Sequence, residues 1–201
     1  MKRKKPIIMV ASTVHGGFDR DIEQICATLR GFGYEVWNSH LGTIPVHSNM
    51  SALDSCIKAV SECDLFLSII RPFYGSGIEE KGGISITHRE ILKAIELDKP
   101  RWFLAHHHVV FARQILRQYM FDEHDQPNPK FEFRKCSVMD DVKVITMYND
   151  AIRSHIPIKE RKGNWVQEFT KIDNILEYIS AQFADIKRVK GTFIINKTTP
   201  L

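Results

Sequence analysis

The stretch PIIMVAS, residues 6–12, is a continuous run of apolar side chains that ends in a serine. Runs of this kind are typical of strands that are buried on both faces, as in parallel sheets. A second stretch, DLFLSIIR at residues 64–71, has the same strongly apolar character. The two stretches therefore predict two strands of a parallel β-sheet.

A helical pattern follows each strand that the sequence predicts. Helices are expected at residues 21–33, 52–63 (capped by Ser51), 88–98 and 108–121, and further strands at 34–40 and 99–106. Four β-then-α units joined by short connections predict a parallel sheet with helices on both faces. The expected fold is thus α/β, with a sheet of four to five strands.

The pattern weakens after residue 121. Residues 131–137 could form a short strand or an extended segment, and residues 139–153 could be a strand or a helix, with the helix favoured. Residues 164–186 predict an amphipathic helix whose apolar stripe faces the core or a partner: Trp165, Phe169, Ile172, Ile175, Ile179 and Phe183. We therefore expect an α/β domain at 5–120 and a C-terminal helical extension at 121–201 that packs on the domain or on a partner.

Composition and charge limit the class of protein. The 201 residues carry a net charge of +4, and the initial MKRKK supplies four positive charges, which leaves 24 Lys and Arg against 24 Asp and Glu. This balance disfavours nucleic-acid binding. The four cysteines form no CxxC pair, and no apolar run approaches the roughly 18 residues of a membrane span. These features predict a soluble, reduced, cytoplasmic protein with no membrane segment.

The stretch GSGIEEKGGISITHREI, residues 75–91, follows a predicted strand and contains a lone carboxylate, Glu90. Ligands of parallel sheets collect at the carboxyl ends of the strands, which here include Ser12 and Thr13 as well as this stretch. Glu90 could complete a capping box with Thr87. Alternatively, its carboxylate could act as a nucleophile or stabilise an oxocarbenium-like sugar centre. The glycines fit either a ligand-binding loop or a lid, and match neither a GxGxxG nor a Walker motif.

Several other polar residues allow two interpretations. Ser12 and Thr13 could bind phosphate or ribose, or form a local turn. Asp64 could contact a ligand, or cap the preceding helix or turn. The run His106-His107-His108 suggests a metal site, but three consecutive histidines are not expected to point one way, and no other ligand stands nearby. The sequence therefore predicts no metal.

The motifs together resemble a bacterial domain family of formerly unknown function, over residues 5–120. The family is best known as an N-terminal module of NTPase and repeat-containing proteins, many of them in anti-phage defence. The matching positions are Ser12-Thr13, Cys56, Val60, Cys63-Asp64, Tyr74-Gly75, Ser85-Ile86-Thr87, Glu90, Ala94 and Lys99-Pro100. The sequence departs from the family after the first strand, where Val14-His15-Gly16-Gly17 replace the usual residues.

This family is similar in turn to Toll/interleukin-receptor (TIR) domains and nucleoside deoxyribosyltransferases. The resemblance implies a flavodoxin-like sheet, a catalytic glutamate at Glu90, and cleavage of the N-glycosidic bond of NAD or a nucleotide. The substrate-binding residues that it implies are Ser12, Thr13, Asp64, Tyr74, Gly75, Ser85 and Thr87. No separate cofactor is expected, and the partners are a nucleotide or NAD-type molecule and a second copy or a defence protein. The alternative is a non-catalytic module that binds a nucleotide signal or oligomerises.

Overall fold

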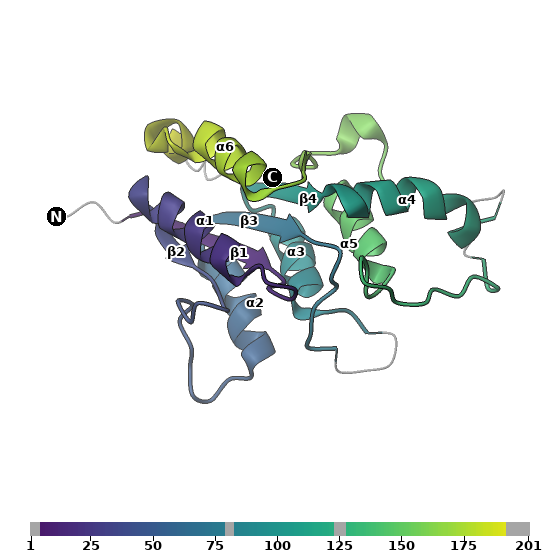
Figure 1. Cartoon of the computed structure of the whole chain (residues 1–201). Helices are drawn as coiled ribbons and strands as arrows, with labels where there is room; N and C mark the ends of the chain where they lie inside the picture. The colour runs from purple at the N-terminus through teal and green to yellow at the C-terminus, as the bar shows by residue number, and fades with distance from the viewer. Residues whose placement is uncertain (1–4, 79–82, 123–127, 192–201) are drawn as a thin grey trace.

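The structure, a computed structural model, describes residues 5–78, 83–122 and 128–191 (Figure 1). Five parallel strands form one sheet in the order β2-β1-β3-β4-β5. The strands are β1 (Ile7–Ser12), β2 (Glu35–Trp37), β3 (Leu65–Ile70), β4 (Arg101–His106) and β5 (Val166–Phe169). This strand order is that of the flavodoxin-like folds and confirms the predicted α/β class.

Helices cover both faces of the sheet, as predicted. They are α1 (Asp19–Gly31), α2 (Ala52–Glu62), α3 (Ile86–Glu96), α4 (His107–Met120), α5 (Lys143–Ala151) and α6 (Ile172–Phe183), with a short 3-10 turn, η1 (Ile158–Glu160). Alternate side chains of a strand point to opposite faces. Leu65 and Leu67 of β3 pack with α1 and α6, whereas Phe66 and Ile70 pack with α2, α3 and α5. Figure 1 shows α1 and α6 together on one side of the sheet.

The single helix predicted over residues 164–186 is wrong in its first part. Val166–Phe169 form β5, which pairs with β4, and the helix begins only at Ile172. Trp165 is 72% exposed and belongs to no apolar stripe. The remaining apolar residues of α6, including Ile175, Ile179 and Phe183, are buried against the sheet and α1, so this face is core.

Two further expectations concern the segment between α4 and β5. The helix favoured over residues 139–153 is confirmed as α5, whereas residues 131–137 form no strand. The connection after residue 121 lies partly outside the described residues, and the chain after residue 191 lies wholly outside them. Within the described residues, no helix has both the length and the hydropathy needed to cross a membrane.

The strand order determines where a ligand would bind. After β1 the chain moves to β2 on one side, and it then returns to β3 on the other side of β1. The connections therefore leave the carboxyl ends of β1 and β3 in opposite directions, which opens a crevice between them. Strand order alone thus indicates that a ligand would bind next to the segments that follow Ser12 and Ile70.

Candidate functional site

A cleft of about 610 Å³ lies at this point of the sheet. Its lining comes from the segments after β1, β2 and β3, from α2 and α3, and from the residue Asp140 before α5. The lining residues are Ser12, Thr13, Val14, His15, Ser39, His40, Ala52, Cys56, Gly75, Ser76, Ile86, Thr87, Glu90 and Asp140. The volume falls within the usual range for small-molecule sites.

Side-chain hydrogen bonds anchor the end of β1 to the end of β3 and to the loop that follows it. The Ser12 hydroxyl donates to the carbonyl of Ile69 at 3.0 Å, and the Thr13 hydroxyl donates to the carbonyl of Phe73 at 2.9 Å. The guanidinium of Arg71 donates to the carbonyl of Thr13 at 3.1 Å. The two hydroxyl groups therefore reach the cleft with fixed positions, because their protons are already committed to backbone acceptors.

Glu90 projects from the second turn of α3, and only 3% of its surface is exposed. The helix is capped by Ser85, whose hydroxyl accepts from the backbone N–H of His88 at 3.4 Å. Thr87 lies inside the helix rather than at its cap, so Glu90 is not the third residue after the cap that a capping box requires. The capping-box interpretation of Glu90 is therefore wrong.

Burial dominates the electrostatics of the Glu90 carboxyl group. Removal from water raises the pKa of Glu90 to about 8, against a hydrogen bond from the Cys56 thiol that lowers it. The pKa of Cys56 rises to about 12, first because the thiol is buried and then because the Glu90 carboxylate lies beside it. A carboxyl group with this pKa is mostly protonated at neutral pH and becomes ionised when a positive charge is placed beside it.

A buried chain of hydrogen bonds supports the wall behind the cleft. The Tyr74 hydroxyl and Nδ1 of His88 are 2.8 Å apart, and Nε2 of His88 lies 2.8 Å from the carboxylate of Asp150 on α5. The backbone N–H of Tyr74 donates to the carboxylate of Asp140 at 2.8 Å. Tyr74 therefore joins the loop after β3 to both ends of α5, and holds Asp140 at the rim of the cleft.

The structure brings most of the predicted site residues together. Five of them line the cleft: Ser12, Thr13, Gly75, Thr87 and Glu90. Tyr74 and Ser85 are buried behind the lining and contribute through hydrogen bonds. Asp64 lies elsewhere, at the amino end of β3, where its carboxylate accepts from the N–H of Ile7 at 2.9 Å. This contact joins the amino ends of β1 and β3, and it is not the cap of the preceding helix or turn that the sequence also allowed for Asp64.

Six polar lining residues were not among the predicted site residues: His15, Ser39, His40, Cys56, Ser76 and Asp140. Ser39 and His40 follow β2 at the same sheet edge, so the rule of strand ends could have identified them. Cys56 and Asp140 come from a helix and from a distant connection, and no local pattern indicates that they reach the cleft.

The three consecutive histidines lie together at the start of α4. One ligand atom from each of His106, His107 and His108 falls within 4.8 Å of the others, so the expectation that they cannot point one way is wrong. Burial, followed by the two neighbouring rings, lowers the pKa of His106 to about 4. Nδ1 of His106 already accepts the N–H of His108 at 3.2 Å, so one potential ligand atom is used within the protein.

The chain has weak similarity to solved structures. The CMP N-glycosidase BcmB of Clostridium botulinum is 16% identical, with a TM-score of 0.45, and the match covers 87% of this chain and 98% of that one. A conserved protein of Enterococcus faecalis V583 is 12% identical, with a TM-score of 0.41, and the match covers 89% of this chain and 99% of that one. A comparison with curated proteins gives no match.

The match to a protein family is clearer than the similarity to solved structures. It also covers more of the chain than the resemblance found in the sequence, which spans residues 5–120. Residues 7–184 match the family described as a domain of unknown function, DUF4062. The match includes β5 and α6 as well as every strand that borders the cleft. The protein is therefore a member of the DUF4062 family.

Proposed function

We propose that the protein is an N-glycosidase that cleaves a nucleotide or NAD-type substrate in the cleft beside Glu90. The observation that carries the proposal is a carboxyl group, 3% exposed, at the lining of a polar cleft at the switch point of the sheet. Carboxyl groups with strongly raised pKa values are concentrated at functional sites, because structural positions seldom tolerate the cost of burial. The TIR and transferase resemblance supports the same residue.

The proposed reaction uses Glu90 as the group that meets the sugar carbon. The bond between C1′ and the base nitrogen breaks, its electron pair leaves with the base, and positive charge develops at C1′. That charge favours the ionised form of Glu90, which stabilises C1′ or bonds to it. Water then attacks C1′ and displaces any bond to Glu90. The proton that water releases goes to the base of a nucleotide or, when neutral nicotinamide leaves NAD, to solvent, and the products are the free base and the ribosyl compound.

The other lining residues would bind and orient the substrate. Thr13, Thr87 and Gly75 offer two hydroxyl groups and an open backbone close to Glu90. Gly75 has a φ of +92°, and a Cβ there would lie 2.5 Å from Cγ2 of Thr13. Only glycine therefore lets the backbone at residue 75 lie this close to Thr13. Ser12 and Ser76 would complete the polar surface, and Tyr74 and Ser85 would hold this surface in place from behind.

Turnover of candidate substrates tests the assignment of Glu90. NAD, nucleotides and nucleosides are incubated with the purified protein, and base release is followed by chromatography for wild type and Glu90→Gln. We expect the variant to lose about a thousand-fold in rate, because the amide cannot ionise. Ser61→Ala on the exposed surface of α2 is the matched control. Equal turnover in wild type and Glu90→Gln would refute the role of Glu90.

A second candidate function is nucleotide binding without chemistry. It is favoured by the raised pKa of Glu90, because a carboxyl group that is neutral at pH 7 can donate a hydrogen bond to a bound ribose without taking part in a reaction. Under this alternative NAD or a nucleotide binds and is recovered intact. Binding measured by calorimetry, with no base released over hours, would establish it.

We also propose a role in bacterial anti-phage defence, acting in the cytoplasm as a homo-oligomer or with a defence partner. The support is the family resemblance and four free cysteines, which suit a reducing compartment. Plaque counts on cells that express wild type or Glu90→Gln test the defence role. Light scattering of the purified protein tests self-association, and a monomer at working concentration would rule out the homo-oligomer.

A further inference from the structure

A second and larger cavity, of about 660 Å³, lies between α4, α5 and the loop that contains η1. It is separate from the Glu90 cleft and shares no lining residue with it. Its lining is Arg113, Arg117, Met120, Phe121, Ile145, Asn149, Ser154, His155 and Arg161. Three arginines and a histidine face the cavity, and no aspartate or glutamate does so among the described residues.

Two of the arginines are held by uncharged groups, so their positive charge is not neutralised at these contacts. Nε of Arg113 donates to the side-chain carbonyl of Asn149, and its guanidinium lies 5.6 Å from the centre of the Tyr148 ring. Within the described residues, the terminal nitrogens of Arg113 have no hydrogen-bond partner. They remain able to bind two oxygens of one anion.

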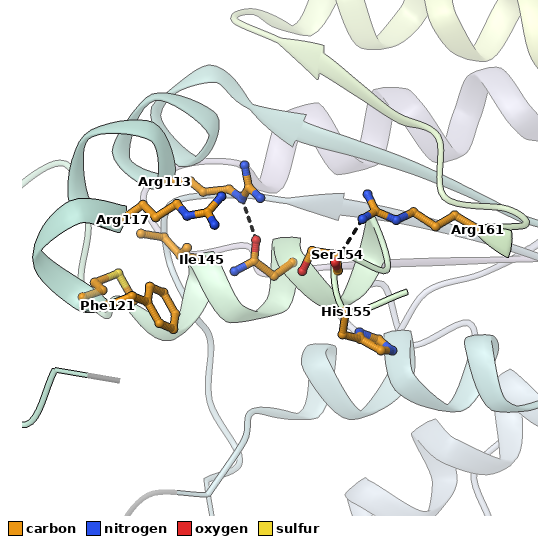
Figure 2. A pocket seen from close by; sticks show the side chains of 9 residues that line it. Arg113, Arg117, Phe121, Ile145, Ser154, His155 and Arg161 are labelled. Carbon is orange, nitrogen blue, oxygen red and sulfur yellow. Dashed lines mark hydrogen bonds between the residues drawn. The ribbon is translucent and has the colours of Figure 1, made fainter. Parts of the chain in front are cut away.

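Arg161 reaches the cavity from the opposite side. Its guanidinium donates to the backbone carbonyls of Ser154, at 3.0 Å, and of Ile156. Figure 2 shows Arg113 and Arg117 on α4, with Arg161 approaching across Ser154. The carboxylate of Asp122 lines the neighbouring groove rather than this cavity. Fixed arginines with neutral partners are typical of phosphate-binding sites.

One wall of the same cavity is apolar. Met120 and Phe121 at the end of α4 face Ile145 of α5, and Figure 2 shows Phe121 close to Ile145. An inorganic ion would leave this wall uncovered, whereas a ligand with a planar ring could bury it while its phosphates contact the arginines. The cavity therefore combines the two surfaces that a nucleotide requires.

We propose that this cavity, the arginine pocket, is a second ligand site that binds a phosphorylated small molecule with a planar ring, such as a nucleoside diphosphate. The phosphates bind between Arg113 and Arg161, and the ring lies against Phe121. The site is independent of the chemistry at Glu90, so it holds for a catalytic and a non-catalytic protein alike.

Calorimetry with ADP, adenosine and inorganic pyrophosphate tests the proposal. We expect ADP to bind at least tenfold more tightly than either probe, since only ADP contacts both surfaces. Arg113→Gln should weaken ADP binding about tenfold or more, through loss of charge-assisted hydrogen bonds. Arg117→Gln provides a second variant in the same cavity, on an exposed residue whose replacement leaves the core intact.

Two controls separate the arginine pocket from the cleft and from general charge. Lys159→Gln removes a positive charge from the exposed turn next to Arg161 and should leave ADP affinity unchanged within about twofold. Glu90→Gln shows which cavity holds the ADP, because only a ligand in the cleft contacts that residue. The proposal is overturned if Glu90→Gln abolishes ADP binding, if adenosine binds as tightly as ADP, or if neither arginine variant weakens the binding of ADP that wild type shows. Absence of ADP binding to wild type also overturns it.

Discussion

The thiol of Cys56 on α2 lies beside the carboxyl group of Glu90 on α3, and each group shifts the pKa of the other. This contact joins the two helices beneath the cleft, where both side chains are almost fully buried. It gives the carboxylate one stabilising partner, whereas burial favours the protonated form more strongly. The protonation state of Glu90 is therefore the property of the cleft that responds most readily to pH and to ligands.

The pH dependence of turnover should report the ionisation of Glu90. The pKa of Glu90 is raised to about 8, and the proposed reaction uses its carboxylate, so kcat/KM is expected to rise with pH and level off above about pH 8. Cys56→Ala removes the hydrogen bond that lowers this pKa and should move the rising limb to higher pH. A profile that falls with pH over this range would indicate a general acid instead.

The stability of the folded chain should decrease with pH over the same range. Glu90 has a pKa of 4.5 when unperturbed and about 8 when folded, so the native state holds an extra proton between these values. Its contribution is fully present below about pH 4.5 and is lost as pH rises through 8, by up to about 1.4 kcal/mol per pH unit. Urea denaturation at pH 5 to 8 should show this slope in wild type and a flatter one in Glu90→Gln. Parallel slopes would contradict it.

The sequence predicts the sheet because its core signals are local. Leu65 to Ile70 are apolar apart from Ser68, and Ser51 and the apolar residues of α2 mark a helix without reference to the rest of the chain. Strand β5 is a different case. Its four residues show no clear alternation, and Phe169 falls in register with the helical repeat of Ile172 and Ile175. Only the pairing with β4, some sixty residues earlier, makes this segment a strand.

The residues of the candidate site also fall into those that a local pattern predicts and those that depend on long-range contacts. Ser12, Thr13 and Gly75 follow strand ends, and strand ends can be located from the apolar runs. Asp64 precedes its strand, so the same rule places it at the opposite edge of the sheet, where the structure has it. Cys56 and Asp140 reach the cleft through packing of α2 on α3 and through the hydrogen bond to Tyr74, which are long-range contacts.

Alkylation should distinguish the cysteines by burial and pKa. Cys26, Cys56 and Cys63 are buried with pKa values raised to about 11 or 12, whereas Cys136 is exposed. We expect iodoacetamide at pH 8 to label Cys136 alone in the native protein, because thiolates are the reactive form. Mass spectrometry of peptides measures this, and labelling in urea should reach all four. Labelling of native Cys56 as fast as Cys136 would show that the cleft opens in solution.

Substitution of Gly75 should destabilise the chain through both backbone strain and a collision. Gly75→Ala places a methyl group 2.5 Å from Cγ2 of Thr13 at a φ of +92°. Gly17 is a matched control, since its φ is +82° and a Cβ there meets nothing within 4 Å. Gly17→Ala should show the strain alone, and Gly75→Ala should cost about 1–3 kcal/mol more in urea denaturation. Equal losses would mean that the loop relaxes around the methyl group.

Removal of the Tyr74 hydroxyl should cost stability because it leaves its partner unsatisfied. Tyr74→Phe deprives the buried Nδ1 of His88 of its hydrogen bond, which is expected to lower the free energy of unfolding by about 1–3 kcal/mol. Tyr178→Phe is the control, since within the described chain the Tyr178 hydroxyl has no hydrogen-bond partner. A loss no larger than that of the control would show that His88 finds another partner.

Helix α5 begins three residues after Asp140, which lines the cleft, and contains Asn149, which lines the arginine pocket. Its nine residues span about 13 Å, so the segment from Asp140 through α5 connects the cleft to the arginine pocket. A ligand that shifts α5 by contacting Asn149 would also displace Asp140 at the cleft. Occupancy of the two cavities is then thermodynamically linked. If a ligand in one cavity changes the affinity of the other cavity by some factor, a ligand in the second changes the affinity of the first by the same factor.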